Sequence, residues 1–403
     1  MTETRGDAIA RKNVFRLAAA QALAGANASV VFATAAIVGS TMAPDKSLAT
    51  LPVTMFVVGM AAGTLPTGAI SRRYGRRVAF LIGALLGALC GFLAAYAIVI
   101  NSFPLFCFAT FFGGTYASVT QSYRFAAADG ASPEFRPKAL SWVMAGGVVA
   151  GVVGPQIVQA TMNLWSPYLF SVSYIGQAIV ALLALLVLWG VDAPPPTAAV
   201  LASSTGRPLM EVARQPKFIA AAICGVVSYA LMNLVMTSAP LAMRLCGLSL
   251  SDSNLGIQWH VIAMYGPSFF TGHLIARFGA GRVVLAGLVL TAAAALVDMS
   301  GLSVSHFWVG LILLGVGWNF GFVGASAMVL ETHRPEEKNK VQAFNDFLVF
   351  GTMAVGSFSS GQLLANFGWN AVNIVVFPPV VIGLIALVVS GGLQNRRRPA
   401  NLS

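Results

Sequence analysis

The stretch GAISRRYGRR at residues 68–77 decides the fold, because a related stretch, GHLIARFGAGR, stands roughly 200 residues later at residues 272–282. Aligned on Gly75 and Gly279, both stretches have a glycine seven residues earlier and an Arg-aromatic-Gly turn. A second pair of sites agrees, since Pro-Glu-x-x-x-Lys occurs at residues 133–138 and again at 335–340. Two matching pairs at similar offsets predict an internal repeat, in which both halves of the chain follow one plan.

The chain around these stretches is strongly apolar. Of its 403 residues, 57% are hydrophobic and 9% are charged, whereas a soluble globular domain carries about 25% charged residues. This composition excludes a water-soluble enzyme and a disordered scaffold. The sequence also lacks a phosphate-binding glycine loop and a recognisable nucleophile–base pair. We therefore expect an integral membrane protein that is not an enzyme.

The apolar residues fall into twelve segments long enough to cross a bilayer, which takes roughly 20 residues of helix. The longest polar connection, residues 192–217, divides them into six and six. The sequence predicts an N-terminal half at 1–191, a cytoplasmic linker at 192–217 and a C-terminal half at 218–403. The predicted segments are 14–42, 47–70, 78–100, 102–126, 138–162, 167–191, 218–245, 253–276, 283–305, 307–331, 341–366 and 370–394.

Lysine and arginine predict the orientation of these segments. They gather in alternate connections, such as 72–77, 207–217 and 334–340, and at both ends of the chain. Because cytoplasmic loops of membrane proteins carry an excess of Lys and Arg, both termini are predicted to be cytoplasmic. The net charge of +11 then marks the cytoplasmic face and does not indicate a nucleic-acid partner.

Two six-helix halves joined by a cytoplasmic linker resemble the major facilitator superfamily, and residues 68–77 resemble that family's loop motif between spans 2 and 3. The resemblance implies an all-α membrane protein of twelve transmembrane helices in two pseudo-symmetric halves, which alternate access to a site near the midplane. The motif's acidic residue is Ser71 here, so its latch must be built differently, and Asp346 is a candidate partner for Arg72 or Arg73. The residues implied in a cytoplasmic gate are Gly68, Arg72, Arg73, Gly75, Arg76, Arg77 and Asp346.

Few ionisable residues interrupt the apolar segments, and such residues are functional candidates in a membrane. Asp298 lies in the outer half of the ninth segment, where it could accept a proton for coupling or form a hydrogen bond between helices. Arg124 lies near the cytoplasmic end of the fourth segment, and we expect its side chain to extend toward the membrane interface.

Two methionine-containing motifs suggest a substrate. Met232-x-x-x-Met236 lies in the seventh segment and His260-x-x-x-Met264 in the eighth, at similar depths. A spacing of four places each pair on one face of its helix. Two or more thioethers with an imidazole favour Cu(I) over magnesium, calcium or manganese. Helix packing stays the alternative, because methionines commonly fill cores.

These motifs resemble the paired motifs of the CcoA-type bacterial copper importers. The resemblance implies a secondary transporter that brings Cu(I) across the bacterial inner membrane for the copper supply of cytochrome oxidase. Met232, Met236, His260 and Met264 would then bind the metal. Cys224 and Cys246 become candidates for a thiol relay. Copper is the expected substrate, and no permanently bound cofactor is expected.

Other functions stay open at this point. Related members of this branch are associated with riboflavin uptake, and proton-driven drug efflux is mildly favoured by the partial glycine-proline motif at residues 146–155. A non-transporting receptor or scaffold is the alternative from a different class. In each transport hypothesis we expect a monomer in the lipid bilayer, with copper or a small solute as partner and protons as candidates for coupling. Residues suited to a planar, hydrogen-bonding ligand are Gln121, Tyr123, Gln156, Asn233, Gln258, Trp259, Trp318, Asn319 and Asn345.

Overall fold

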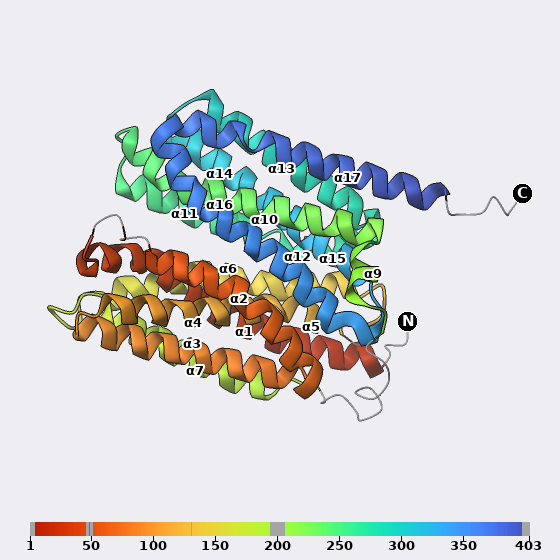
Figure 1. The fold of residues 1–403 in the computed structure, drawn as a ribbon, viewed down its shortest axis with the longest axis horizontal. Coiled ribbons are helices and arrows are strands. Elements are labelled where there is room, and N and C mark those ends of the chain that lie inside the picture. The colour runs from red at the N-terminus through yellow and green to blue at the C-terminus, as the bar shows by residue number, and fades with distance from the viewer. Residues whose placement is uncertain (1–4, 46–47, 49–50, 130, 194–205, 397–403) are drawn as a thin grey trace, which may run out of the picture. The chain divides into compact units, whose positions relative to one another are not determined.

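The computed structural model describes residues 5–45, 48, 51–129, 131–193 and 206–396. All regular elements of this described part are helical (Figure 1), as the apolar segments predict. The elements are α1 (Arg5–Met42), α2 (Leu51–Tyr74), α3 (Arg76–Val99), α4 (Phe103–Gln121), α5 (Tyr123–Ala128), α6 (Arg136–Thr161), α7 (Ser171–Trp189), α9 (Leu209–Ala213), α10 (Pro216–Leu245), α11 (Leu250–Tyr265), α12 (Ser268–Phe278), α13 (Ala280–Ser300), α14 (Val304–Trp318), η2 (Asn319–Val323), α15 (Gly324–Leu330), η3 (Pro335–Glu337), α16 (Lys338–Ile374) and α17 (Phe377–Arg396).

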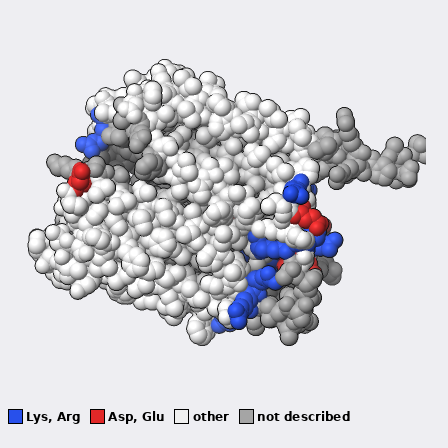
Figure 2. Space-filling view, in the orientation of Figure 1, with Lys and Arg blue, Asp and Glu red and all other residues white. Residues whose placement is uncertain are grey.

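Nine stretches of helix in the described residues are long and apolar enough to cross a membrane. The other predicted segments are helical as well: 102–126 forms α4 and α5, 253–276 forms α11 and α12, and 341–366 lies within α16. On the face drawn in Figure 2, the described charged side chains form small groups, and most of the described surface is uncharged. The nine stretches are Arg11–Gly39, Leu51–Tyr74, Arg76–Val99, Arg136–Thr161, Ser171–Trp189, Pro216–Leu245, Ala280–Ser300, Val304–Leu330 and Asn366–Ser390.

Several helices are interrupted for identifiable reasons. Pro267 follows the end of α11 and has no backbone N–H to continue the helical ladder, so α12 begins as a new helix at Ser268. The helix that starts as α14 passes through a π-helical turn, η2, before it continues as α15. In α16, Gly368 has φ 78° and bends the helix, a backbone conformation open to glycine.

The helices form two compact units. One comprises Met1–Ser204 together with Gln342–Ala354, and the other comprises Thr205–Val341 together with Val355–Ser403. Helix α16 therefore contributes to both units. The predicted boundaries of the linker at 192–217 stay a prediction, and its residues 194–205 lie outside the described part of the chain.

The internal repeat is visible in the backbone. Gly75 joins α2 to α3 with φ 90° and ψ 158°, and Gly279 joins α12 to α13 with φ 87° and ψ 149°. The preceding pairs match too, because the guanidinium carbon of Arg73 lies 5.3 Å from the ring centroid of Tyr74 and that of Arg277 lies 5.3 Å from Phe278. Both copies of the loop thus adopt the same turn.

Candidate functional site

Four aromatic side chains pack together in the second unit, and we call them the aromatic cluster: Tyr229, Tyr265, Trp318 and Phe322. Trp318, at the end of α14, stacks on Phe322 of η2 with ring centroids 5.3 Å apart and planes 21° from parallel. Tyr229 of α10 and Tyr265 of α11 each approach Trp318 edge-on at 5.5 Å. Trp318 is fully buried. Offset and edge-on arrangements of this kind stabilise aromatic groups beyond their burial alone.

Asn319, the first residue of the π-helical turn, fixes the position of this cluster. Its Nδ2 donates to the Met264 carbonyl and to Ser268 Oγ, both at 2.6 Å. The Thr271 hydroxyl donates to Asn319 Oδ1, also at 2.6 Å. The amide of Asn319 thereby joins α14 to the break between α11 and α12. Short π-helical turns inside α-helices are frequent at functional sites.

Three buried polar groups in or beside the aromatic cluster have no hydrogen-bond partner among the described residues. They are Trp318 Nε1, Ser228 Oγ and Asn233 Nδ2. Ser228 directly precedes Tyr229 on α10, and Asn233 follows Tyr229 by four residues, about one helical turn. Ser228 lies so close to Gly321 that a side chain at Gly321 would overlap its hydroxyl. A buried polar group without a partner costs about 1–3 kcal/mol. These three groups are free to form hydrogen bonds with a bound ligand.

The sequence found part of this cluster. Trp318, Asn319 and Asn233 belong to the predicted planar-ligand set, because polar and indole groups are rare within apolar segments. Trp259 of the same set is 47% exposed on α11, and Gln258 and Gln156 are exposed as well. Gln121, Tyr123 and Asn345 lie in the first unit. Tyr229, Tyr265, Phe322 and Ser228 were missed.

The predicted copper ligands also lie in the second unit. Met232 and Met264 are buried, and Met236 is partly exposed. His260 is fully buried, and its Nδ1 lies 2.7 Å from the Leu311 carbonyl of α14. The Met264 carbonyl accepts the hydrogen bond from Asn319. His260 and the Met264 backbone thus contact α14 and the π-helical turn that continues it. Such contacts are those expected of residues that pack one helix against another.

The two candidate relay thiols lie far apart along α10. Cys224 is buried, and its Sγ lies 3.7 Å from the Gly383 carbonyl of α17. Cys246 follows the last residue of the helix and is exposed. Asp298, the candidate for coupling, is buried near the end of α13.

The predicted gate residues around Gly75 divide into buried and exposed members. Arg76 is buried, and its Nε donates to Asp129 at 2.6 Å while its Nη2 donates to Gln342 at 2.7 Å. Gly68 is buried within α2, Arg77 lies over the Trp189 ring, and Arg72 and Arg73 are exposed. Asp129, directly after α5, is thus the carboxylate that pairs with the buried Arg76 of this loop.

Asp346 does not pair with Arg72 or Arg73. Its Oδ1 accepts from Arg124 Nη2 at 2.6 Å and from Asn345 at 3.2 Å. Arg124 is fully buried, so the expectation that its side chain extends toward the interface was wrong. A fully buried guanidinium needs a counter-charge, whereas Arg72 and Arg73 lie exposed at the end of α2. The sequence could not find this pair, because its members lie 222 positions apart.

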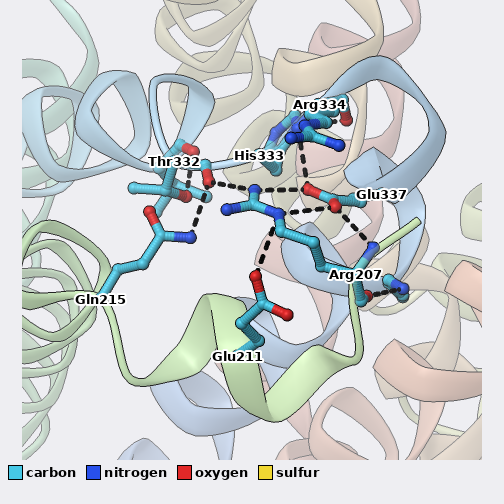
Figure 3. Close-up of polar contacts among 9 residues, drawn as sticks. Arg207, Glu211, Gln215, Thr332, His333, Arg334 and Glu337 are labelled. Carbon is cyan, nitrogen blue, oxygen red and sulfur yellow. Dashed lines mark hydrogen bonds and ion pairs between the residues drawn. The ribbon is translucent and has the colours of Figure 1, made fainter.

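A third ion pair, unforeseen from the sequence, joins Arg207 to Glu337 within the second unit (Figure 3). Glu337 is fully buried. Its Oε1 accepts hydrogen bonds from the backbone N–H and from Nε of Arg207. Its Oε2 accepts a third hydrogen bond, from Arg207 Nη2 at 2.7 Å. These hydrogen bonds lower the pKa of the Glu337 carboxyl from 4.5 to about 2 and raise the pKa of the Arg207 guanidinium. The Thr332 carbonyl accepts from both Arg207 and Gln215. This cluster ties the segment before α9 to the start of α16.

Comparison with known proteins shows the family. The model of the Major Facilitator Superfamily matches residues 17–266 and 221–402. In structure, the chain is similar to the proton:xylose symporter XylE, with a TM-score of 0.80 at 14% identity over 95% of both chains. It is also similar to the E. coli fucose:proton symporter FucP, with a TM-score of 0.70 at 14% identity over 94% of this chain and 97% of that one. The chain belongs to the major facilitator superfamily, and its all-helical fold is the fold of that family.

Relatives in sequence bear on the substrate. The chain is 48% identical to the riboflavin transporter RfnT of Brucella anthropi over 384 residues, which cover 94% of this chain and 96% of that protein. It is 28% identical to an uncharacterized MFS-type transporter, YddS, of Bacillus subtilis over 90% of this chain and 87% of that protein. Copper import, the main functional prediction from the methionine motifs, was therefore wrong. The alternative, riboflavin uptake, is the better-supported substrate prediction.

Proposed function

We propose that this chain carries riboflavin, or a flavin with the same ring system, into the cell by alternating access. The supporting observation is the 48% identity to a riboflavin transporter over 94% of the chain. The matched region covers nearly all of both proteins, so the similarity extends through both halves of the chain. We place the protein in the bacterial inner membrane with both termini in the cytoplasm, following the distribution of Lys and Arg.

The aromatic cluster offers the chemistry that a flavin requires. The isoalloxazine ring is flat and tricyclic, with carbonyl and ring-nitrogen acceptors along its edges. Stacking on an aromatic face and a few hydrogen bonds to those edges would hold it. Trp318 Nε1 and Asn233 Nδ2 are donors left without a partner in the described residues, and Ser228 Oγ can both donate and accept. The ribityl hydroxyls would add hydrogen bonds of their own.

One buried ion pair and one buried hydrogen bond of the first unit suit a gate. Arg124–Asp346 and Arg76–Gln342 join residues of the first six membrane helices to the Gln342–Ala354 segment of α16. In an alternating-access cycle, a helix that contributes to both units must change some of its contacts. We assign these two contacts to the set that is exchanged during transport.

Uptake of radiolabelled riboflavin tests the proposed function. The chain is expressed in a bacterial strain that neither makes nor imports riboflavin, and both growth on low riboflavin and uptake are measured. We expect growth rescue and saturable uptake that unlabelled riboflavin competes away, while copper uptake stays at the level of cells with the empty vector. Uptake of riboflavin no higher than in those cells, at verified membrane expression, would overturn the proposal.

A further inference from the structure

Asp298 is a buried acid that the proposed flavin site does not use. It lies near the end of α13 and is 1% exposed. Neither of its carboxyl oxygens has a hydrogen-bond partner among the described residues. Its backbone carbonyl is occupied, since it accepts from Trp369 Nε1 at 3.1 Å. The carboxyl group is therefore held in place by its main chain while its own oxygens are unsatisfied.

The surroundings of this carboxyl group are apolar. On the α14 side it rests on the backbone of Gly310, so closely that a side chain there would overlap both oxygens. On the α16 side lies Trp369, whose ring packs against Phe307 with centroids 5.1 Å apart. Glycine at position 310 makes room for a group the size of a carboxyl without offering it a side-chain donor.

The titratable side chains of these neighbours do not offer a counter-charge. His306 is the titratable side chain of α14, and its Nδ1 is bonded to Ser303 Oγ at 2.6 Å while its ring packs beside Gly301. The sequence of residues 355–389, which spans the relevant parts of α16 and α17, contains no Asp, Glu, Lys, Arg or His. Arg282, the basic residue of α13, lies at the opposite end of that helix.

An ionised carboxylate in this position would be unpaired and out of water, which costs far more than burying the neutral acid. The described conformation thus holds Asp298 in its protonated form. In a conformation that admits water to this carboxyl group, the same group can ionise. Binding of a proton is then linked to the conformational equilibrium of this unit.

We propose that Asp298 is a proton-binding site whose protonation accompanies closure of α13, α14 and α16 around it. Flavin uptake consequently depends on the proton concentration outside the cell. The statement about uptake rests on the proposed function, whereas the statement about proton binding and closure does not. Two separate measurements distinguish them.

The first measurement is the melting temperature of the purified, detergent-solubilised protein between pH 5.5 and 8.5. Because the folded chain holds a proton that an unfolded Asp has lost by neutral pH, stability falls as pH rises. We expect the native melting temperature to fall over this range, and Asp298→Asn, which mimics the protonated acid, to flatten that fall. Asp252→Asn is the matched control, since Asp252 already accepts from the Ser249 hydroxyl at 2.6 Å. An Asp298→Asn profile that falls as the native one does would overturn the proposal.

The second measurement is riboflavin uptake by cells across the same external pH range. Native uptake should fall several-fold from pH 5.5 to 8.5, and Asp298→Asn should show a flat profile at equal membrane expression. Asp298→Glu, which keeps the titrating group, should retain the pH dependence, and His306→Gln should retain it as well. A native profile that does not change with pH, or a His306→Gln profile that becomes flat, would refute a role for Asp298 in transport. Failure of all uptake, with the melting profiles as expected, would contradict the flavin proposal alone.

Discussion

Trp318 is the residue whose replacement tests the flavin site most directly. Its ring stacks on Phe322, and its Nε1–H has no acceptor among the described residues. Trp318→Phe keeps an aromatic face and removes that donor. A lost hydrogen bond is worth about 0.5–1.5 kcal/mol, so we expect the KM for riboflavin to rise about 3- to 10-fold with little loss of protein. Riboflavin uptake kinetics, normalised to membrane expression, measure this change.

The control for this prediction is Trp165→Phe, the same substitution at an exposed loop position. It should leave both KM and expression unchanged. A KM for Trp318→Phe equal to that of the native protein would remove the indole nitrogen from the proposed site. It would leave the family and the fold untouched, because those rest on the whole chain.

At the residue scale, the sequence draws attention to side chains that are chemically unusual for their surroundings. Asn233 and Trp318 stood out in an apolar segment, and so did Asp298. Tyr229 and Phe322 did not, because a chain with 26 phenylalanines gives no signal for the few that adjoin a site. The methionine motifs illustrate the opposite error. A spacing of four fixes the face on which a side chain lies, but it does not say which helix that face meets.

At the scale of elements, the Arg124–Asp346 pair connects α5 to α16 inside the first unit. Removing one partner of a buried pair leaves an uncompensated charge and costs about 3–5 kcal/mol. We expect Arg124→Gln and Asp346→Asn each to lower the melting temperature strongly, and the double variant to lose less than the sum of the two. Melting curves of the four purified proteins give the coupling directly.

Arg72→Gln serves as the control for that cycle, since Arg72 is exposed at the end of α2. Its melting temperature should match the native value. Additive losses in the double variant would show that the two side chains do not stabilise the fold as a pair.

The Arg207–Glu337 pair predicts a pH dependence with a definite sign. The folded-state pKa of Glu337 is about 2, below the ordinary 4.5. The stabilisation is therefore complete above pH 4.5 and is lost as the pH falls toward 2. We expect Glu337→Gln to cost about 2 kcal/mol at pH 7, and the difference from the native protein to shrink below pH 4.5. Melting temperatures from pH 7 to pH 3 measure it, with the exposed Glu336→Gln as control.

If the difference in melting temperature between Glu337→Gln and the native protein were constant down to pH 3, the hydrogen bonds from Arg207 could not be what lowers the pKa of Glu337.

Segment length and apolar content predicted that helices would form at the twelve places. They did not predict the ion pairs that connect these helices. The break after Tyr265 precedes Pro267, but proline alone does not predict it, because Pro66, Pro155 and Pro240 lie inside continuous helices. The π-helical turn at Asn319–Val323 could not be predicted either, because it depends on three hydrogen bonds to α11 and α12 that only the folded chain brings together.

At the scale of the whole molecule, composition and the internal repeat were sufficient to predict the fold. The repeat can be recognised in the sequence because the turn requires a residue with a positive φ, which favours glycine. Gly75 and Gly279 both adopt a positive φ, with nearly equal angles. The substrate lay beyond this reasoning, because transporters of one fold carry unrelated solutes through a few side chains. Those side chains differ in chemistry while the repeat and the loops stay the same.

The proposed orientation in the membrane can be tested at one cysteine. With the termini in the cytoplasm, α10 runs outward, so Cys246 at its end faces the outside, whereas Cys90, Cys107 and Cys224 are buried. A membrane-impermeant maleimide added to intact cells should therefore label the native protein once, and Cys246→Ser should abolish the labelling. In inside-out vesicles the same reagent should label the protein poorly. Labelling that is strong only in inside-out vesicles would show that the topology is the reverse of the assigned one. Asp298 would then lie toward the cytoplasm, and protons from outside the cell would not reach it directly.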